Sequence, residues 1–500
     1  MTMQSSISGH TPIRLLPIVG WLTAALVLGC AAALAGLPFL YGFIGLALLV
    51  IFGGIVTRYP TAIMVASVWA LALCPFSFGI ETGVLPKLFA DEILLLSYIA
   101  ILLPMYWLTD RIWQTGINKY LLIVAGFVFC QCVSLLIRTD LIAFRNLLET
   151  FILGPMLLVV FLQEAANTDC DELFSKALVW LIALIAVLSI LERILQKNPI
   201  LERLELEGGF QYLSPRIVAI TEGVYRPYVT FFHPSETGTF MAMGLPYAIR
   251  GWIRQRSWLP VVQILLIAAG LGVNATRGVW VGAALSLLLL ARKPIMIVAC
   301  TIPAVGLGGV LAYVALKSTP FMQRLSDANN LLGRFIYWQL GAEVFSDNKI
   351  LGVGHMQFQK VYLDYIRDQS EIAQISLTQI HVIDNVYLTT LAEHGIVGFV
   401  GLIAFFISTG ILLRRFRTRL LDLGLVRQAS LVQATQLVLV VYVVSGFFAD
   451  VNEFTKVTKL LFILIGFGLG TAMKSLYANG RGKARDAASS LLKPELARWG

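Results

Sequence analysis

Three arginines stand out as residues that could do chemistry: Arg226, Arg277 and Arg334. Each lies in or beside a hydrophilic stretch between long apolar runs. A guanidinium presents a planar fork of N–H donors that can hold two phosphate oxygens at once. We therefore expect a phosphate clamp, with Arg277 the strongest candidate, then Arg334 and Arg226. For Arg277, which precedes Gly278, snorkelling to a membrane surface is the alternative explanation.

His381 and Asp384 are the candidate acid–base residues. They are three positions apart, so on a helical turn they would share a face. A histidine or carboxylate with a suitable pKa can accept a proton from a hydroxyl group. The two could act as base and orienting partner, or Asp384 could be the base itself. Alternatively, both only cap a helix that starts at Asn385, since Asp and Asn favour that position.

The composition shows which elements must position these residues. Hydrophobic residues make up 58% of the 500-residue chain and charged residues only 13%. This leaves too few polar residues to cover the surface of a soluble protein. Apolar runs such as 258–273 and 460–469 do not alternate in polarity, so helices rather than barrel strands are expected. The net charge is +9, and the basic residues lie in short loops between apolar runs. Basic residues in such loops orient a protein in the membrane, so the charge does not indicate binding of nucleic acid.

The hydropathy pattern predicts an all-α polytopic membrane protein of about fourteen spans. An even number places every dense basic cluster on one side, so both termini are expected in the cytoplasm. The expected spans are 15–35, 38–56, 60–79, 88–108, 119–137, 141–163, 175–195, 235–249, 258–274, 277–291, 294–316, 386–413, 431–449 and 457–475.

The same pattern divides the chain into four parts. An N-terminal bundle of about eleven helices covers 1–316 and includes an outside loop at 196–234. A periplasmic loop region covers 317–384, C-terminal helices cover 385–476, and a basic cytoplasmic tail covers 477–500. Turn residues and amphipathic patches from Ser318 to Ile372 predict short helices that pack over the mouth of the bundle. Apolar residues recur there at helical spacing from Leu331 to Phe345, with Asp347-Asn348 as the stop.

Charges inside the spans are few. Arg145 and Glu149 are four apart, which is typical of a helix ion pair and leaves substrate contact by Arg145 as the alternative. No charge is expected at mid-membrane with a partner on another span, which argues against a proton-driven carrier. The six cysteines form no CxxC pair, so neither a disulfide framework nor a zinc site is expected from them.

Three blocks resemble the superfamily of O-antigen ligases and O-antigen polymerases, which are glycosyltransferases of the bacterial inner membrane. The first is Arg226-Pro-Tyr-Val-Thr-Phe-Phe-His-Pro-Ser235, and the second is Thr276-Arg277-Gly278. The third runs from Gly333-Arg334 through Trp338 and Gly352-Val353-Gly354 to Asp384-Asn385-Val-Tyr387-Leu388 and Glu393-His394-Gly395. Together they cover about 226–402, and their order and spacing make the resemblance specific.

One departure bears on the reaction. Ligases of the family carry a histidine directly before the asparagine, whereas this chain has Asp384 before Asn385 and its nearest histidine is His381. That histidine is expected to be the ligase base, so its displacement favours a polymerase of O-antigen, capsule or exopolysaccharide repeat units. Ligation to lipid A–core or another acceptor is the alternative. A transporter of lipid-linked oligosaccharides and a non-catalytic scaffold for envelope assembly are alternatives of another class.

The resemblance implies a GT-C-like helical bundle and an undecaprenyl-diphosphate-linked glycan as substrate. It also implies catalysis without a metal or another cofactor. Partners would be membrane lipids and the flippase and chain-length regulator of the same pathway. The residues placed at the site are His381 and Asp384 as catalytic groups and Arg277, Arg334 and Arg226 at the diphosphate. His233, Asn385 and Arg145 are possible substrate contacts, although a histidine before proline is often structural, and Glu393 and Gly395 are expected to set helix packing.

Overall fold

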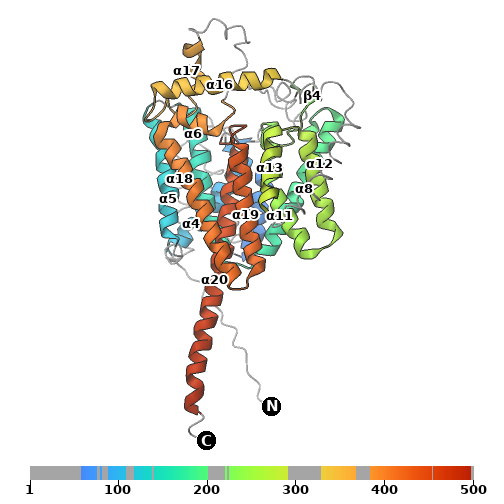
Figure 1. The fold of residues 1–500 in the computed structure, drawn as a ribbon, viewed down its shortest axis with the longest axis vertical. Helices are drawn as coiled ribbons and strands as arrows, with labels where there is room; N and C mark the ends of the chain where they lie inside the picture. Colours follow the sequence, from blue (N-terminus) through green and yellow to red (C-terminus); the bar gives the residue numbers. More distant parts are fainter. Residues whose placement is uncertain are drawn as a thin grey trace, which may run out of the picture.

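Apolar helices run side by side through the body of the molecule, and further helices cross one end of it (Figure 1). The computed structural model describes residues 58–75, 79–80, 88–108, 117–137, 140–200, 220–221, 224–290, 328–366, 383–452 and 454–496. The described residues also form two antiparallel pairs of two-residue strands. In the first, β1 (Gly79–Ile80) pairs with β2 (Leu88–Phe89), and in the second, β3 (Ile220–Thr221) pairs with β4 (Val224–Tyr225). The described part is therefore almost entirely helical.

The helices of the bundle follow the predicted apolar runs. They are α3 (Pro60–Leu73), α4 (Ala90–Leu108), α5 (Asn118–Cys132), α6 (Leu141–Leu147), α7 (Gly154–Asn167), α8 (Asp171–Leu195), α11 (Pro234–Gln255), α12 (Trp258–Asn274), α13 (Arg277–Leu290), α18 (Val386–Asp422), α19 (Val426–Ser445) and α20 (Thr455–Leu496). A short 3₁₀ turn, η2 (Val133–Leu136), extends α5, and a π-helical turn, η3 (Leu148–Leu153), joins α6 to α7.

Six of the described helical segments are long and apolar enough to cross a membrane: 118–136, 141–167, 171–195, 386–422, 426–445 and 455–479. Four shorter apolar helices, at 60–73, 92–104, 258–274 and 277–290, coincide with further predicted spans. The predicted spans 15–35, 38–56 and 294–316 lie outside the described residues. The structure thus gives a multi-pass bundle, and the number fourteen stays a prediction.

The centre of the bundle is the contact between α7 and α20. Gly466 and Gly470 are one turn apart on α20 and face the α7 backbone. A Cβ atom at these positions would lie 2.3 Å from the Leu158 carbonyl oxygen and 2.2 Å from that of Leu162. Small residues four apart allow two membrane helices to approach this closely, which gains van der Waals contact along both backbones.

Helix α16 (Ala328–Asp347) lies across one end of the bundle, with α17 (Phe358–Ile366) beyond it (Figure 1). We call this the α16 end. Helix α16 ends at Asp347, as the sequence pattern predicts. At the opposite end α20 continues as one helix to Leu496, past the predicted end of the span at 475, and projects from the bundle (Figure 1).

The segment after α16 returns to the bundle and docks into a break in α18. The amide of Val353 donates to the Ala392 carbonyl at 2.9 Å, and that of Gly354 donates to the Glu393 carbonyl at 3.0 Å. Gly395 breaks the helix with a φ of 63°. A Cβ atom there would lie 2.3 Å from the Ile350 carbonyl oxygen, so only glycine fits. The Gly-Val-Gly and Glu-x-Gly motifs are two sides of one backbone junction.

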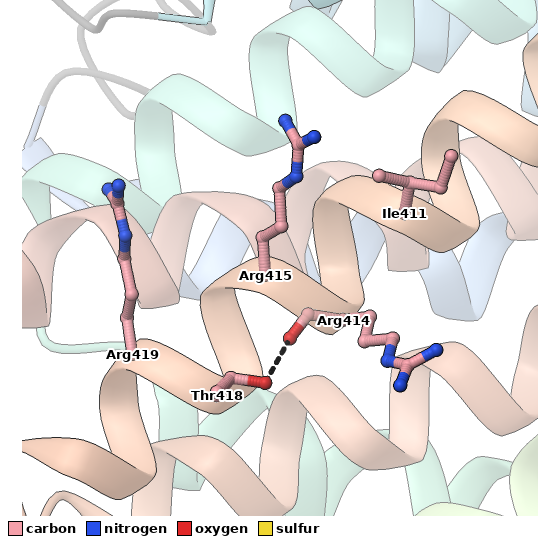
Figure 2. Close-up of a pocket in the computed structure, with 5 residues that line it drawn as sticks. All are labelled: Ile411, Arg414, Arg415, Thr418 and Arg419. Atoms are coloured by element: carbon pink, nitrogen blue, oxygen red, sulfur yellow. Dashed lines mark hydrogen bonds between the residues drawn. The ribbon is translucent and has the colours of Figure 1, made fainter.

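Basic residues gather at the opposite end. Arg254 at the end of α11 and Arg427 at the start of α19 both contact Glu172 at the start of α8. A surface pocket of about 560 Å³ on the last turns of α18 is lined by Arg414, Arg415 and Arg419 (Figure 2). The pocket lies near the last residues of α18, at the other end of that helix from its first residue, Val386.

Candidate active site

Arg226 joins the first two motif blocks. It lies just after β4 and is buried, with 7% of its surface exposed. Its Nη2 donates to the Thr276 hydroxyl at 2.7 Å and lies 3.5 Å from that of Ser235, and its Nε donates to the Asn274 carbonyl at 3.4 Å. The guanidinium is therefore held beside the Thr-Arg-Gly turn that begins α13.

Asn274 sets the geometry of that turn. Its fully buried side chain donates to the carbonyls of Pro227 at 3.0 Å and Pro234 at 2.8 Å, and its Oδ1 accepts from the Thr276 hydroxyl at 2.6 Å. A Cβ atom on Gly238 would lie 2.6 Å from the same Oδ1. This one amide therefore binds the start of α11, the loop before it and the α12–α13 turn together.

A buried carboxylate fixes the loop that carries Arg226. Glu192, on the last turns of α8, accepts from the Tyr225 hydroxyl at 2.7 Å and from the amides of Tyr228 at 3.2 Å and Val229 at 2.7 Å. Arg193 donates to the Tyr225 carbonyl. These hydrogen bonds hold the backbone on both sides of Arg226.

Arg334 and Asp384 form an ion pair. The Arg334 Nη2 lies 3.5 Å from the Asp384 Oδ2, and the two side chains are 29% and 42% exposed. Desolvation by the surrounding protein raises the pKa of the Asp384 carboxyl group above the ordinary value, although part of the side chain is exposed. The positive charges of Arg334 and Arg226 act on the same carboxylate and oppose that rise. Asp384 thus lies in the field of two of the three predicted arginines.

Asn385 caps α18. Its Oδ1 accepts from the amides of Tyr387 at 2.9 Å and Leu388 at 3.2 Å, and the residue is 6% exposed. Of the alternatives raised for this segment, capping therefore applies to Asn385, while the side chain of Asp384 turns to Arg334 instead. His381 lies outside the described residues.

Residues 262–403 match the family model described as O-Antigen ligase. The resemblance to the O-antigen ligase and polymerase superfamily is confirmed by this match. Together with the apolar helices, it indicates a multi-pass membrane enzyme of the ligase or polymerase type. No curated protein matches the chain. The matched segment contains Arg277, Arg334 and Asp384, whereas Arg226 lies before it.

Two further predicted site residues begin helices. Arg277 is the first residue of α13, and the Gly278 beside it lets Phe448 approach, since a Cβ there would lie 2.2 Å from the Phe448 Cβ. His233 caps α11, because its Nδ1 accepts from the Ser235 amide at 3.1 Å, and its ring stacks on Phe454 at 5.6 Å. The structure gives His233 a structural task, and substrate contact by it stays a prediction.

Arg145 belongs to a buried charge network that the sequence did not reveal. It lies 4.0 Å from Glu149, as the i,i+4 spacing suggests, and 3.4 Å from Glu92 on α4. Lys459 of α20, whose side chain is fully buried, pairs with Glu149 at 2.6 Å and lies 4.0 Å from Glu92. The pairing of Lys459 with Glu149 connects two predicted spans, which the sequence analysis did not predict. The network connects α4, α6, η3 and α20.

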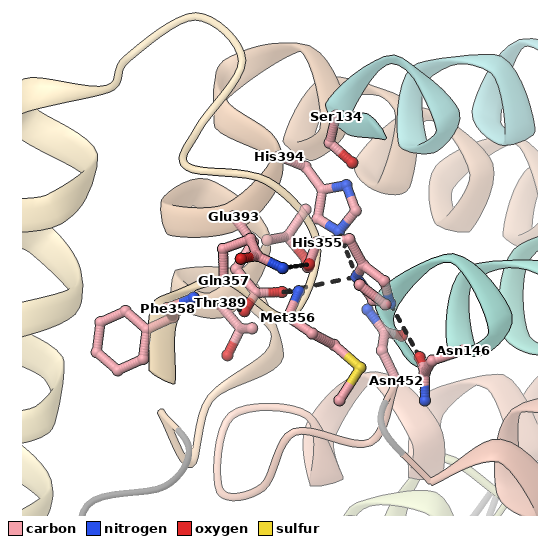
Figure 3. Close-up of polar contacts among 12 residues, drawn as sticks. Ser134, Asn146, His355, Met356, Gln357, Phe358, Thr389, Glu393, His394 and Asn452 are labelled. Carbon is pink, nitrogen blue, oxygen red and sulfur yellow. Dashed lines mark hydrogen bonds and ion pairs between the residues drawn. The ribbon is translucent and has the colours of Figure 1, made fainter. Parts of the chain in front are cut away.

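A second unpredicted cluster lies where the α16 return segment meets α18. His355, Glu393 and His394 are all buried and direct their side chains toward one another (Figure 3). Glu393 was predicted to set helix packing, and its carboxylate accepts from the amides of Met356 at 2.8 Å and Phe358 at 3.3 Å. The two histidines had no signal beyond their places next to the Gly-Val-Gly and Glu-x-Gly motifs.

Proposed function

We propose that the chain is a glycosyltransferase that polymerises undecaprenyl-diphosphate-linked repeat units into O-antigen, capsule or exopolysaccharide on the periplasmic face of the inner membrane. The observation that carries the proposal is the Arg334–Asp384 pair, 3.5 Å apart, in the field of Arg226. A base and a cationic clamp are the two groups that this transfer needs, and Asp384 and the arginines would supply them.

The arginines would bind the diphosphate of the donor. When the acceptor oxygen attacks the anomeric carbon, the bond from that carbon to the diphosphate oxygen breaks, and negative charge grows on the leaving group. Fixed guanidinium groups stabilise such charge in place of a metal ion. Arg334 has five N–H donors and can hold Asp384 and a phosphate oxygen together. Arg277, beside Thr276, would complete the clamp.

Asp384 would take the proton of the acceptor hydroxyl. A carboxylate with a raised pKa is a stronger base than an ordinary aspartate, and its exposure leaves room for an acceptor sugar. His381, three residues before it, is the alternative base or orienting partner. The proton moves to the base as the new glycosidic bond forms, and the polyprenyl diphosphate leaves.

The presence of Asp384 before Asn385 favours polymerisation over ligation, because ligases of the family are expected to carry histidine there. The ligase alternative is supported by the description of the matched family. The gene neighbourhood discriminates between them: a flippase and chain-length regulator beside several glycosyltransferases favour polymerase, and lipid A–core genes favour ligase.

The proposal requires the α16 end to face the periplasm. Ser346 at that end and Thr418 near the arginine pocket are both exposed. In a cysteine-free background, Ser346→Cys in spheroplasts should react with a membrane-impermeant maleimide, and Thr418→Cys should react only after lysis. The opposite pattern would reverse the orientation and defeat the proposal.

The central experiment tests the clamp. Arg277→Ala and Arg334→Ala should each leave a folded protein that accumulates single lipid-linked repeat units. Arg415→Ala, which removes an exposed arginine at the opposite end, is the matched control and should keep long chains. Product of wild-type length from both clamp variants would overturn the proposal. Transfer of glycan to lipid A–core by the wild type, without chain growth, would select the ligase alternative.

A further inference from the structure

The buried cluster of His355, Glu393 and His394 brings three metal-ligating atoms together. The His355 Nδ1, the His394 Nε2 and one Glu393 carboxylate oxygen lie within 4.8 Å of one another. His355 comes from the segment after α16, and the other two come from α18, so the cluster joins two elements that are distant in sequence (Figure 3). The two imidazoles are only 5% and 3% exposed.

The groups around the cluster direct the lone pairs inward. The His394 Nδ1 lies 3.3 Å from the Gln131 carbonyl oxygen, which can only accept, so this nitrogen carries the proton and Nε2 is left as a ligand. On the other side the His355 Nε2 lies 2.9 Å from the Asn146 Oδ1. Donation to that oxygen leaves the His355 Nδ1 as a ligand. Such outer partners are typical of metal-binding histidines.

Two of the three distances between the ligand atoms match those around a tetrahedral ion. The His355 Nδ1 and the His394 Nε2 are 3.2 Å apart. If each lies about 2.05 Å from a zinc ion, the N–Zn–N angle is roughly 100°. The Glu393 Oε2 lies 3.6 Å from the His355 Nδ1, which gives an O–Zn–N angle of roughly 120° by the same reasoning. Both values bracket the tetrahedral angle.

The charge of the cluster also favours a cation. Among the described residues, the ion-pair partner of Glu393 is His355, and both are buried. A buried carboxylate is costly unless a positive charge or hydrogen bonds compensate it. Its two backbone donors occupy one lone pair on each oxygen and leave others for a metal.

We propose that His355, His394 and Glu393 bind one Zn²⁺ ion, with water at the fourth position. Two imidazoles and a carboxylate are a ligand set that zinc accepts. The ion would fasten the segment after α16, and hence the base of the helix that carries Arg334, to the break in α18. It is separate from the diphosphate clamp, so the proposal does not rest on the proposed reaction.

The competing arrangement has no metal. In it the Asn146 amide is reversed and donates to the His355 Nε2, and the His355 Nδ1 donates to the His394 Nε2. Metal content separates the two. The full-length protein, purified in detergent with any polyhistidine tag removed and supplied with Zn²⁺, should retain about one zinc per chain after desalting. Cobalt supplied instead should give the intense visible absorption of a tetrahedral site.

Variants locate the ion. His355→Ala and His394→Ala should lose the zinc and the cobalt spectrum, whereas His233→Ala, the matched control, should keep both. Asn146→Ala removes only an outer partner and should weaken zinc binding by about 10- to 100-fold. A wild type that retains no zinc, or a His355→Ala variant that retains as much as the wild type, overturns the proposal. The wild-type result decides even if the alanine variants do not fold.

Discussion

The buried charge network allows a quantitative test of what holds the bundle together. Its described members are two acids, Glu92 and Glu149, and two bases, Arg145 and Lys459, so their charges cancel. Lys459→Met keeps most of the side-chain volume but leaves the buried group with one net negative charge. The Lys459–Glu149 contact of 2.6 Å corresponds to an attraction of about 6 kcal/mol at an effective dielectric constant of 20.

Desolvation of the two charges offsets much of that attraction. Removing one partner of a buried pair nevertheless costs about 3–5 kcal/mol, because the other charge is left uncompensated. We expect Lys459→Met to lower the free energy of unfolding by this amount. Glu149→Gln leaves the opposite charge in excess and should cost a similar amount. The double variant restores neutrality, with Glu92 and Arg145 still paired.

The assay is reversible unfolding in mixed detergent micelles, followed by tryptophan fluorescence. The double variant should be about 2–3 kcal/mol more stable than the sum of the single losses predicts. Lys176→Met is the matched control: Lys176 pairs with Glu172 at 3.6 Å but is 56% exposed, so the loss should stay within about 1 kcal/mol. Additive losses in the double variant, or equal losses at Lys459 and Lys176, would refute the reasoning.

Three further predictions concern other parts of the molecule. If Asp384 is the base, kcat/KM should fall as the pH drops through a pKa above the ordinary aspartate value of about 3.9, because protonation removes the base. Asp384→Asn should abolish activity at every pH. A kcat/KM that does not change on the acid side of the pH profile would contradict this. Asp140 caps α6 through the Ala143 amide and pairs with Lys360, which lowers its pKa to about 2. A carboxylate whose pKa is lowered in the folded protein stabilises the fold at pH values above its unfolded-state pKa, and this stabilisation is lost as the pH falls toward about 2. Asp140→Ala should lower the free energy of unfolding at neutral pH by about 1 kcal/mol. Asp140→Asn, which can still cap the helix, should lower it by less. Gly466→Leu should displace α20 from α7 and prevent a folded monodisperse peak on size exclusion, whereas Gly126→Leu, on α5 with open space around it, should keep that peak.

The sequence predicted best those features that depend on the residues of a single segment. Apolar length and turn residues located the described helices, and the stop of α16 at Asp347 followed from its Asp-Asn ending. Arg334 and Asp384 were both predicted, but their pairing was not, because 50 residues separate them. The helical-turn relation between His381 and Asp384 stays a prediction.

The charge network is a feature that could not be predicted from the sequence. Lys459 lies 310 residues from Glu149, and a single lysine near the start of an apolar run has the same pattern whether it snorkels or pairs. Only the packing of α20 against α7 brings the two together. His355 and His394 were missed for the same reason, since their meeting depends on the left-handed Gly395 and the return segment that docks there.

The candidate active site is formed by residues inside the matched segment and residues that precede it. Arg334 and Asp384 lie within 262–403, but Arg226 and the Glu192 that fixes its loop lie before it. Asn274 is the junction, because its side chain holds the loop of Arg226 to the Thr276 turn. Substituting Asn274 would leave the carbonyls of Pro227 and Pro234 without this buried donor. Such a change should displace Arg226 from Asp384 while leaving every predicted clamp and base residue in the sequence, so activity would be lost without the loss of any catalytic group.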